Sequence, residues 1–191
     1  MFDEAIIESW LHAAGLGPAA AELERVYADA AAAIAARGPA CWASGRCCNF
    51  DQAGHRLYVT GLEAAYCLVR VVSSPWAEAG KQVRAGRPAV AVTINGRAIE
   101  LGPTPTGEGV IADIDAARVR GGCRFQAASL CGFHAVKPLG CRVYFCDRTA
   151  ETWQQELSER LLRDIRDIHD RYRLPYRYGE WRDMLDQFRA R

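Results

Sequence analysis

Seven of the eight cysteines lie in two short segments of the chain, and this distribution limits the possible folds more than any other feature. The first segment covers residues 41–48 and the second covers residues 123–146. Thiolates are soft ligands that suit zinc and iron–sulfur clusters. Ligands from two distant segments close a long loop around a metal, so metal binding and folding would be coupled. The candidate ligands are Cys41, Cys47, Cys48, Cys123, Cys131, Cys141 and Cys146.

The adjacent pair Cys47 and Cys48 raises a geometric question, because neighbouring side chains of an extended chain point to opposite sides. Both can bind metal only with a special backbone conformation or with two separate metals. Otherwise one of them is structural, or is a redox thiol. No two cysteines have the Cys-x2-Cys spacing that is usual in zinc sites, which favours an iron–sulfur cluster over a zinc finger.

The composition is that of a globular chain that does not need disulfides. Half of the 191 residues are hydrophobic, so one domain can bury an apolar core. The acidic start, with Asp3 and Glu4, does not resemble a secretory signal, and no apolar run is long enough to span a membrane. We therefore expect a cytoplasmic protein, in which cysteines are metal ligands or redox groups. The net charge of +1 gives no reason to expect binding to nucleic acid or a membrane.

Hydrophobic periodicity predicts two helices at the N-terminus. Asp3 can cap the first helix, which ends at Gly15. Pro18 suits the first turn of the second helix, which ends at Gly38. A long helix is predicted near the other end of the chain, where an apolar stripe runs through residues 151–173.

We expect Thr149 to cap this long helix and Pro175 to break it. A last short helix follows, with apolar residues Trp181, Leu185 and Phe188. In the middle of the chain, Thr60 and Glu63 form a capping-box pattern at the start of another helix.

The clearest β signal comes from residues 89–94 and 97–101, which flank an Asn-Gly pair that favours a two-residue turn. Together the patterns predict a mostly helical α+β fold with a small β-hairpin and irregular, cysteine-rich metal-binding loops. We expect a single domain over residues 1–191. Its parts are N-terminal helices in 1–38, a cysteine-cluster metal-binding core in 39–148 and C-terminal helices in 149–191.

Two residues near the candidate ligands have simpler interpretations. Cys67 lies on a predicted helix, where we expect a small buried side chain, since free cysteine is often buried. His134 lies within the second segment, and we expect it to support the ligands rather than to bind metal. Cationic residues that could favour thiolates, unless they only reflect the arginine-rich composition, are Arg46, Arg120, Arg124, Lys137, Arg142 and Arg148.

The residues around the cysteines also follow a family pattern. The first segment reads Cys41-x2-Ser44-x2-Cys47-Cys48, and the second contains, in order, Cys123-Arg124-Phe125, Cys131, Lys137-Pro138, Cys141-Arg142, Tyr144 and Cys146. This order resembles that of the zinc- or iron-chelating cysteine-cluster family, the YkgJ-like or CxxCxxCC proteins. The resemblance implies a bacterial metal-chelating protein, and an iron–sulfur cluster is the usual inference for its better-understood relatives, which include flagellin lysine methylases.

Ser44 departs from that pattern, because the family has a cysteine there and a hydroxyl is a poor ligand for a soft metal. The first segment therefore offers at most three thiolates. A four-ligand site can still form. We expect it to use one of the Cys47-Cys48 pair with Cys123, Cys131 and Cys141, while Cys41 and Cys146 are the next candidates.

Three functions follow as hypotheses. The first is a small iron–sulfur protein with a [4Fe–4S] cluster, which serves in electron transfer or supports a partner enzyme, and so has a redox or protein partner. The second is a structural zinc protein that acts as an interaction module. The third is a cluster-dependent enzyme of unknown substrate, in which an open iron position or a spare cysteine such as Cys48 or Cys146 acts on the substrate.

Overall fold

The computed structural model describes residues 2–15, 17–38, 45–72, 90–94, 97–101, 117, 119–127, 130–131, 133–145 and 147–188. Its α-helices are α1 (Glu4–Ala14), α2 (Pro18–Arg37), α3 (Phe50–Ala53), α4 (Gly61–Val72), α7 (Leu139–Val143), α8 (Glu151–Arg171) and α9 (Trp181–Asp186). Its 3-10 turns are η1 (Arg46–Cys48) and η2 (Arg148–Ala150). Within this described part, no helix combines the length and the apolar character needed to cross a membrane.

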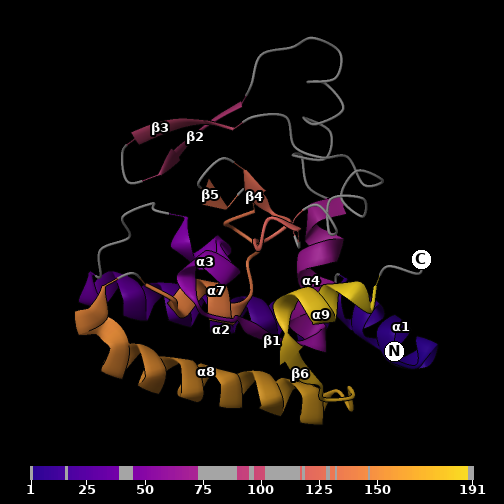
Figure 1. Cartoon of the computed structure of the whole chain (residues 1–191). Coiled ribbons are helices and arrows are strands. Elements are labelled where there is room, and N and C mark those ends of the chain that lie inside the picture. Colours follow the sequence, from indigo (N-terminus) through magenta and orange to yellow (C-terminus); the bar gives the residue numbers. More distant parts are fainter. Residues whose placement is uncertain are drawn as a thin grey trace.

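The strands are short and form two-stranded antiparallel pairs. They are β1 (Tyr58–Thr60), β2 (Val90–Ile94), β3 (Arg97–Leu101), β4 (Gln126–Ala127), β5 (Leu130–Cys131) and β6 (Tyr178–Glu180). The predicted hairpin is confirmed by β2 and β3, in which Ile94 is opposite Arg97; its Asn-Gly turn lies outside the described residues. The mostly helical α+β fold is thus confirmed (Figure 1).

The long helices α2 and α8 run antiparallel along one side of the molecule (Figure 1). At one end of the pair, the Tyr172 hydroxyl donates a 2.9 Å hydrogen bond to Glu22, which also pairs with Arg171. At the other end, the guanidinium of Arg37 lies over the ring of Trp153. Helix α7 packs against both long helices, so this pair supports part of the second cysteine segment.

The apolar core joins the two ends of the chain. Trp10 of α1 is fully buried, and its Nε1 donates a 2.8 Å hydrogen bond to the carbonyl of Pro175. Strand β1 pairs with β6, and the amide of Trp181 donates a 2.8 Å hydrogen bond to the carbonyl of Leu57. The predicted apolar stripe of α8 is confirmed by its buried residues Leu157, Leu161, Ile165 and Ile168.

The predicted helix caps are confirmed at the N-terminus and wrong for α8. Asp3 accepts a hydrogen bond from the amide of Ala5, as a cap should. Thr149, however, lies in η2 and donates its hydroxyl hydrogen bond to Asp147, so α8 begins after Ala150 instead. The 3-10 turn displaces the threonine from the capping position. Helix α8 also ends at Arg171, before Pro175 is reached.

Candidate metal centre

The first cysteine segment resolves the geometric question of the adjacent pair. Residues 46–48 form the 3-10 turn η1, and Gly45 before it has a φ of 73°, which glycine adopts without strain. The amide of Cys48 donates a 2.9 Å hydrogen bond to the carbonyl of Gly45. This turn brings the Sγ atoms of Cys47 and Cys48 to within 3.9 Å of each other. The special backbone conformation that two neighbouring ligands require is therefore present.

The second segment is held against the first by main-chain hydrogen bonds. The amide of Cys123 donates to the carbonyl of Cys48 across 2.7 Å, and the amide of Asp51 donates to the carbonyl of Gly121 across 3.0 Å. Gly121 has a φ of 68°, and a Cβ added there would lie 2.7 Å from the Asp51 side chain. Only glycine allows this close approach, which brings Cys123 beside the first segment.

The third part of the site is the β4–β5 pair, in which Cys131 lies opposite Gln126. This short hairpin returns the chain toward the first segment. The Sγ atoms of Cys47 and Cys48 lie 3.9 Å apart, and the thiols of Cys123 and Cys131 are close enough to Cys48 to raise its pKa. Cys47, Cys48, Cys123 and Cys131, from the two cysteine segments, thus lie in one neighbourhood.

Helices α7 and α4 add two more cysteines next to this group. Cys141 lies in α7, and its thiol interacts electrostatically with those of Cys123 and Cys131. Cys67 lies in α4 and is 1% exposed, which confirms the prediction of a buried side chain. Its thiol also interacts electrostatically with those of Cys123 and Cys131. The sequence did not indicate this, because Cys67 lies far from both cysteine segments along the chain.

Glu63 fixes α7 relative to α4. Its carboxylate is buried and accepts hydrogen bonds from the amide and hydroxyl of Thr60, at 2.9 Å and 3.1 Å, so the capping box is confirmed. It also accepts a 2.8 Å hydrogen bond from the amide of Leu139, the first residue of α7, and a 3.4 Å bond from the hydroxyl of Tyr27. Glu63 therefore holds the start of the helix that carries Cys141.

The thiols differ in acidity. The hydrogen bond from Cys48, with a smaller contribution from Lys137, lowers the pKa of Cys47 to about 6. The pKa of Cys131 is also lowered, first by its hydrogen bond with Cys48 and further by Lys137. The pKa of Cys48 is raised, since it is the group that stays protonated and donates. Burial is the main cause of the raised pKa of Cys141, and the same holds for Cys67.

Cationic and aromatic side chains surround the thiols. The ammonium of Lys137 lies 2.8 Å from Nε2 of His134, and burial followed by Lys137 lowers the pKa of His134 to about 4. His134 therefore contacts Lys137, a cation that helps to lower the pKa of Cys47 and of Cys131. The rings of Phe125 and Phe133 meet edge to face, with centroids 5.2 Å apart.

His55 is a neighbour of the site that carried no sequence signal. Its ring stacks on Tyr144 with centroids 4.3 Å apart and meets the ring of Phe50 edge to face. Burial lowers the pKa of His55, while the backbone of Cys47 acts in the opposite direction. Its distance from the cysteines along the chain is small, but only the fold shows that its ring lies beside η1.

The described cysteine thiols are suitable ligands for a metal, but their side chains are not arranged around a metal position in this structure. Among the described residues, no group of three or more Cys, His, Asp or Glu side chains is arranged to hold a metal ion. The described thiols are Cys47, Cys48, Cys67, Cys123, Cys131 and Cys141, all without a disulfide. Cys41 and Cys146 lie outside the described residues.

Three comparisons with known proteins complete the description of the site. No family model, no curated protein and no solved structure matches this chain.

Proposed function

We propose that this chain is a cytoplasmic metal-binding protein that holds a [4Fe–4S] cluster and serves in electron transfer or supports a partner enzyme. The observation that carries the proposal is the junction of two distant cysteine segments: the amide of Cys123 donates a 2.7 Å hydrogen bond to the carbonyl of Cys48, whose Sγ lies 3.9 Å from that of Cys47. Four cysteine thiolates are the ligands that such a cluster takes. The resemblance to the YkgJ-like cysteine-cluster family points the same way and belongs to this proposal.

The ligands that we propose are Cys47, Cys48, Cys123 and Cys131, with Cys141 as the neighbouring alternative. Main-chain hydrogen bonds between the two segments bring these cysteines near one another while their thiols carry protons. A bound metal displaces those protons, because a coordinating thiol is deprotonated. Lys137, which already lowers the pKa of Cys47 and Cys131, would stabilise the thiolates in the bound state.

Zinc is the second candidate, because four thiols also complete a closed structural zinc site. The chain would then be an interaction module rather than a redox protein. The lack of Cys-x2-Cys spacing argues against this alternative.

The test is purification of the full chain from iron-supplemented cells under anaerobic conditions, followed by analysis of iron, zinc and labile sulfide. We expect a brown protein with about four irons and about four sulfides per chain, as a [4Fe–4S] cluster requires. Its absorbance should decrease when a reductant is added. A colourless protein with one zinc per chain would establish the zinc site instead.

A further inference from the structure

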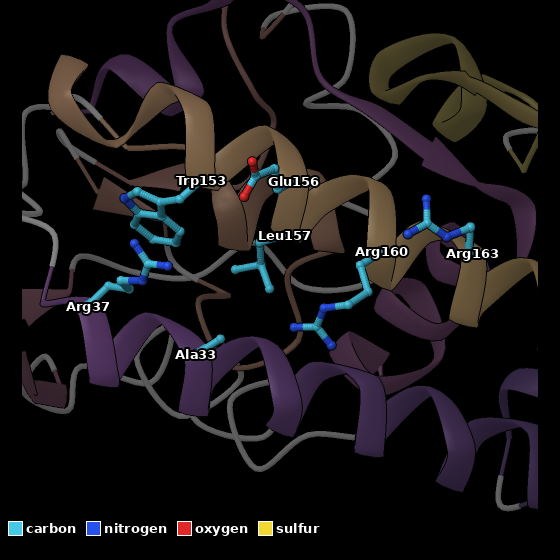
Figure 2. A pocket seen from close by; sticks show the side chains of 7 residues that line it. All are labelled: Ala33, Arg37, Trp153, Glu156, Leu157, Arg160 and Arg163. Carbon is cyan, nitrogen blue, oxygen red and sulfur yellow. The ribbon is translucent and has the colours of Figure 1, made fainter.

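A second feature of the molecule lies between the long helices α2 and α8, and no cysteine lines it (Figure 2). A groove of about 340 Å³ opens there near the C-terminal end of α2. Its lining residues are Ala33, Arg37, Trp153, Glu156, Leu157, Arg160 and Arg163.

The groove exists because α2 presents short side chains to α8. Ala33 faces Leu157 across the gap, and a methyl group cannot fill the space that a longer side chain would occupy (Figure 2). Leu157 is buried and gives the groove an apolar floor. Trp153 is half-buried and adds an aromatic surface at one end. These features suit the apolar part of a ligand.

Guanidinium groups stand on both sides of this floor. Arg37 and Arg160 extend into the space between the two helices on opposite sides of Leu157 (Figure 2). Glu156 and Arg163 also line the groove, with their charged ends directed away from Leu157 (Figure 2). Among the residues that the structure describes, no carboxylate lies within 4.0 Å of the guanidinium of Arg37 or Arg160.

Arg37 is also oriented by its neighbour. Its guanidinium carbon lies 5.7 Å from the centre of the Trp153 ring, so the cation is held over the aromatic face. Holding the guanidinium in one place lowers the entropy that an ion pair with a ligand would cost.

From this arrangement we infer that the α2–α8 groove binds a small organic anion, a phosphate or carboxylate attached to an aromatic body. The anionic group pairs with Arg37 and Arg160, because guanidinium donors match both kinds of oxyanion. The aromatic body rests on Leu157 and beside Trp153. The volume of the groove is at the lower end of the range of about 300–1,000 Å³ for ligand sites, so a ligand of one or two rings fits.

The test uses isothermal titration calorimetry of the full chain with 1-naphthyl phosphate, 1-naphthoic acid and inorganic phosphate. We expect one of the two naphthyl anions to bind, and the comparison between them identifies the preferred oxyanion. Inorganic phosphate should bind at least about tenfold more weakly, since it lacks the apolar body. Equal binding of inorganic phosphate, or no binding of either naphthyl anion, would overturn the inference.

Substitutions of the two groove arginines test whether the anion binds in the groove. Arg37→Gln and Arg160→Gln should each weaken binding by about tenfold, because each removes a charged hydrogen-bond donor. Arg25→Gln is the matched control: it removes the same charge from α2, but Arg25 lies near Tyr172 at the opposite end of the helix pair. If Arg25→Gln weakens binding as much as the groove variants, the attraction is non-specific and the site is not this groove. Circular dichroism melting checks that each variant is folded.

Discussion

The amide of Cys123 donates a 2.7 Å hydrogen bond to the carbonyl of Cys48, so the two cysteine segments are joined through their main chains. This bond does not depend on any thiol or metal. It brings the thiols together before they are deprotonated, and it reduces the entropy that a metal must overcome when it collects ligands from distant segments. The site is therefore partly organised by the backbone.

Cys48 is the most informative position for metal binding, since its thiol lies 3.9 Å from that of Cys47 and its carbonyl accepts the hydrogen bond from Cys123. The variant Cys48→Ser keeps the size of the side chain but removes a soft ligand. We expect the iron content of the anaerobically purified protein to fall to about a tenth or less of the wild-type value, since even the loss of a supporting residue can cost 10- to 100-fold in metal affinity.

Cys67→Ala is the matched control for this experiment. Cys67 is buried in α4 and lies near the same thiols, but we expect it to be a packing residue. Its variant should keep the full iron content and lose only stability, by about 1 kcal/mol for the truncated side chain. Loss of iron from Cys67→Ala with retention in Cys48→Ser would mean that the ligand set has been assigned wrongly.

Gly121→Ala tests the main-chain junction without touching a thiol. The added Cβ would lie 2.7 Å from the Asp51 side chain, at a φ of 68° that alanine disfavours. We expect a loss of about 1–3 kcal/mol in the free energy of unfolding and a matching loss of iron content. Gly179→Ala is the control, because its Cβ would meet only the end of the flexible Met184 side chain, 3.4 Å away. Wild-type iron content in Gly121→Ala would show that the junction does not organise the site.

Much of the fold could be predicted from local patterns. The Asp3 cap, the Thr60–Glu63 capping box and the α8 stripe each depend on residues a few positions apart, and each is confirmed. The candidate site could not be predicted in the same way. The approach of Cys48, Cys123 and Cys131 to one another depends on main-chain hydrogen bonds between segments that are distant in the sequence. The place of Cys67 beside them depends on the packing of α4, which no local pattern contains.

Glu63 should give the protein a distinctive dependence of stability on pH. Burial raises the pKa of this carboxyl above its ordinary value of 4.5. At a pH between 4.5 and the raised pKa, Glu63 is protonated in the folded state and ionised in the unfolded state. Its contribution to stability is therefore complete below pH 4.5 and is lost as the pH rises through the raised pKa. Glu63→Gln should abolish this decline, which urea unfolding at a series of pH values measures.

The same variant tests the hydrogen bonds of Glu63. At low pH we expect Glu63→Gln to be less stable than the wild type by about 1–3 kcal/mol, because the amide nitrogen replaces one of the two oxygens that accept from Thr60 and Leu139 and cannot accept a hydrogen bond. Glu24→Gln is a suitable comparison, since Glu24 is partly exposed and pairs with Arg70. Its loss should not exceed about 1 kcal/mol. Equal pH profiles for wild type and Glu63→Gln would contradict a raised pKa.

Cys47 should be a reactive thiol once metal has been removed. Its pKa is lowered to about 6, first by the hydrogen bond from Cys48 and also by Lys137, so it is mostly thiolate at neutral pH. Cys48 and Cys67 have raised pKa values and stay protonated. We therefore expect iodoacetamide to add one group to the peptide that contains Cys47 and Cys48, with a rate that is half-maximal near pH 6.

Mass spectrometry of the digested protein measures this reaction, and the peptide that contains Cys67 provides an internal reference. Lys137→Met should move the midpoint to a higher pH, because it removes a positive charge that favours the thiolate. The shift should be smaller than the one produced by Cys48→Ala, since the hydrogen bond from Cys48 is the larger cause. If Cys47 and Cys67 react at the same rate between pH 6 and pH 8, the thiol of Cys47 does not lie beside that of Cys48 in the metal-free protein, and the proposed ligand set loses its structural support.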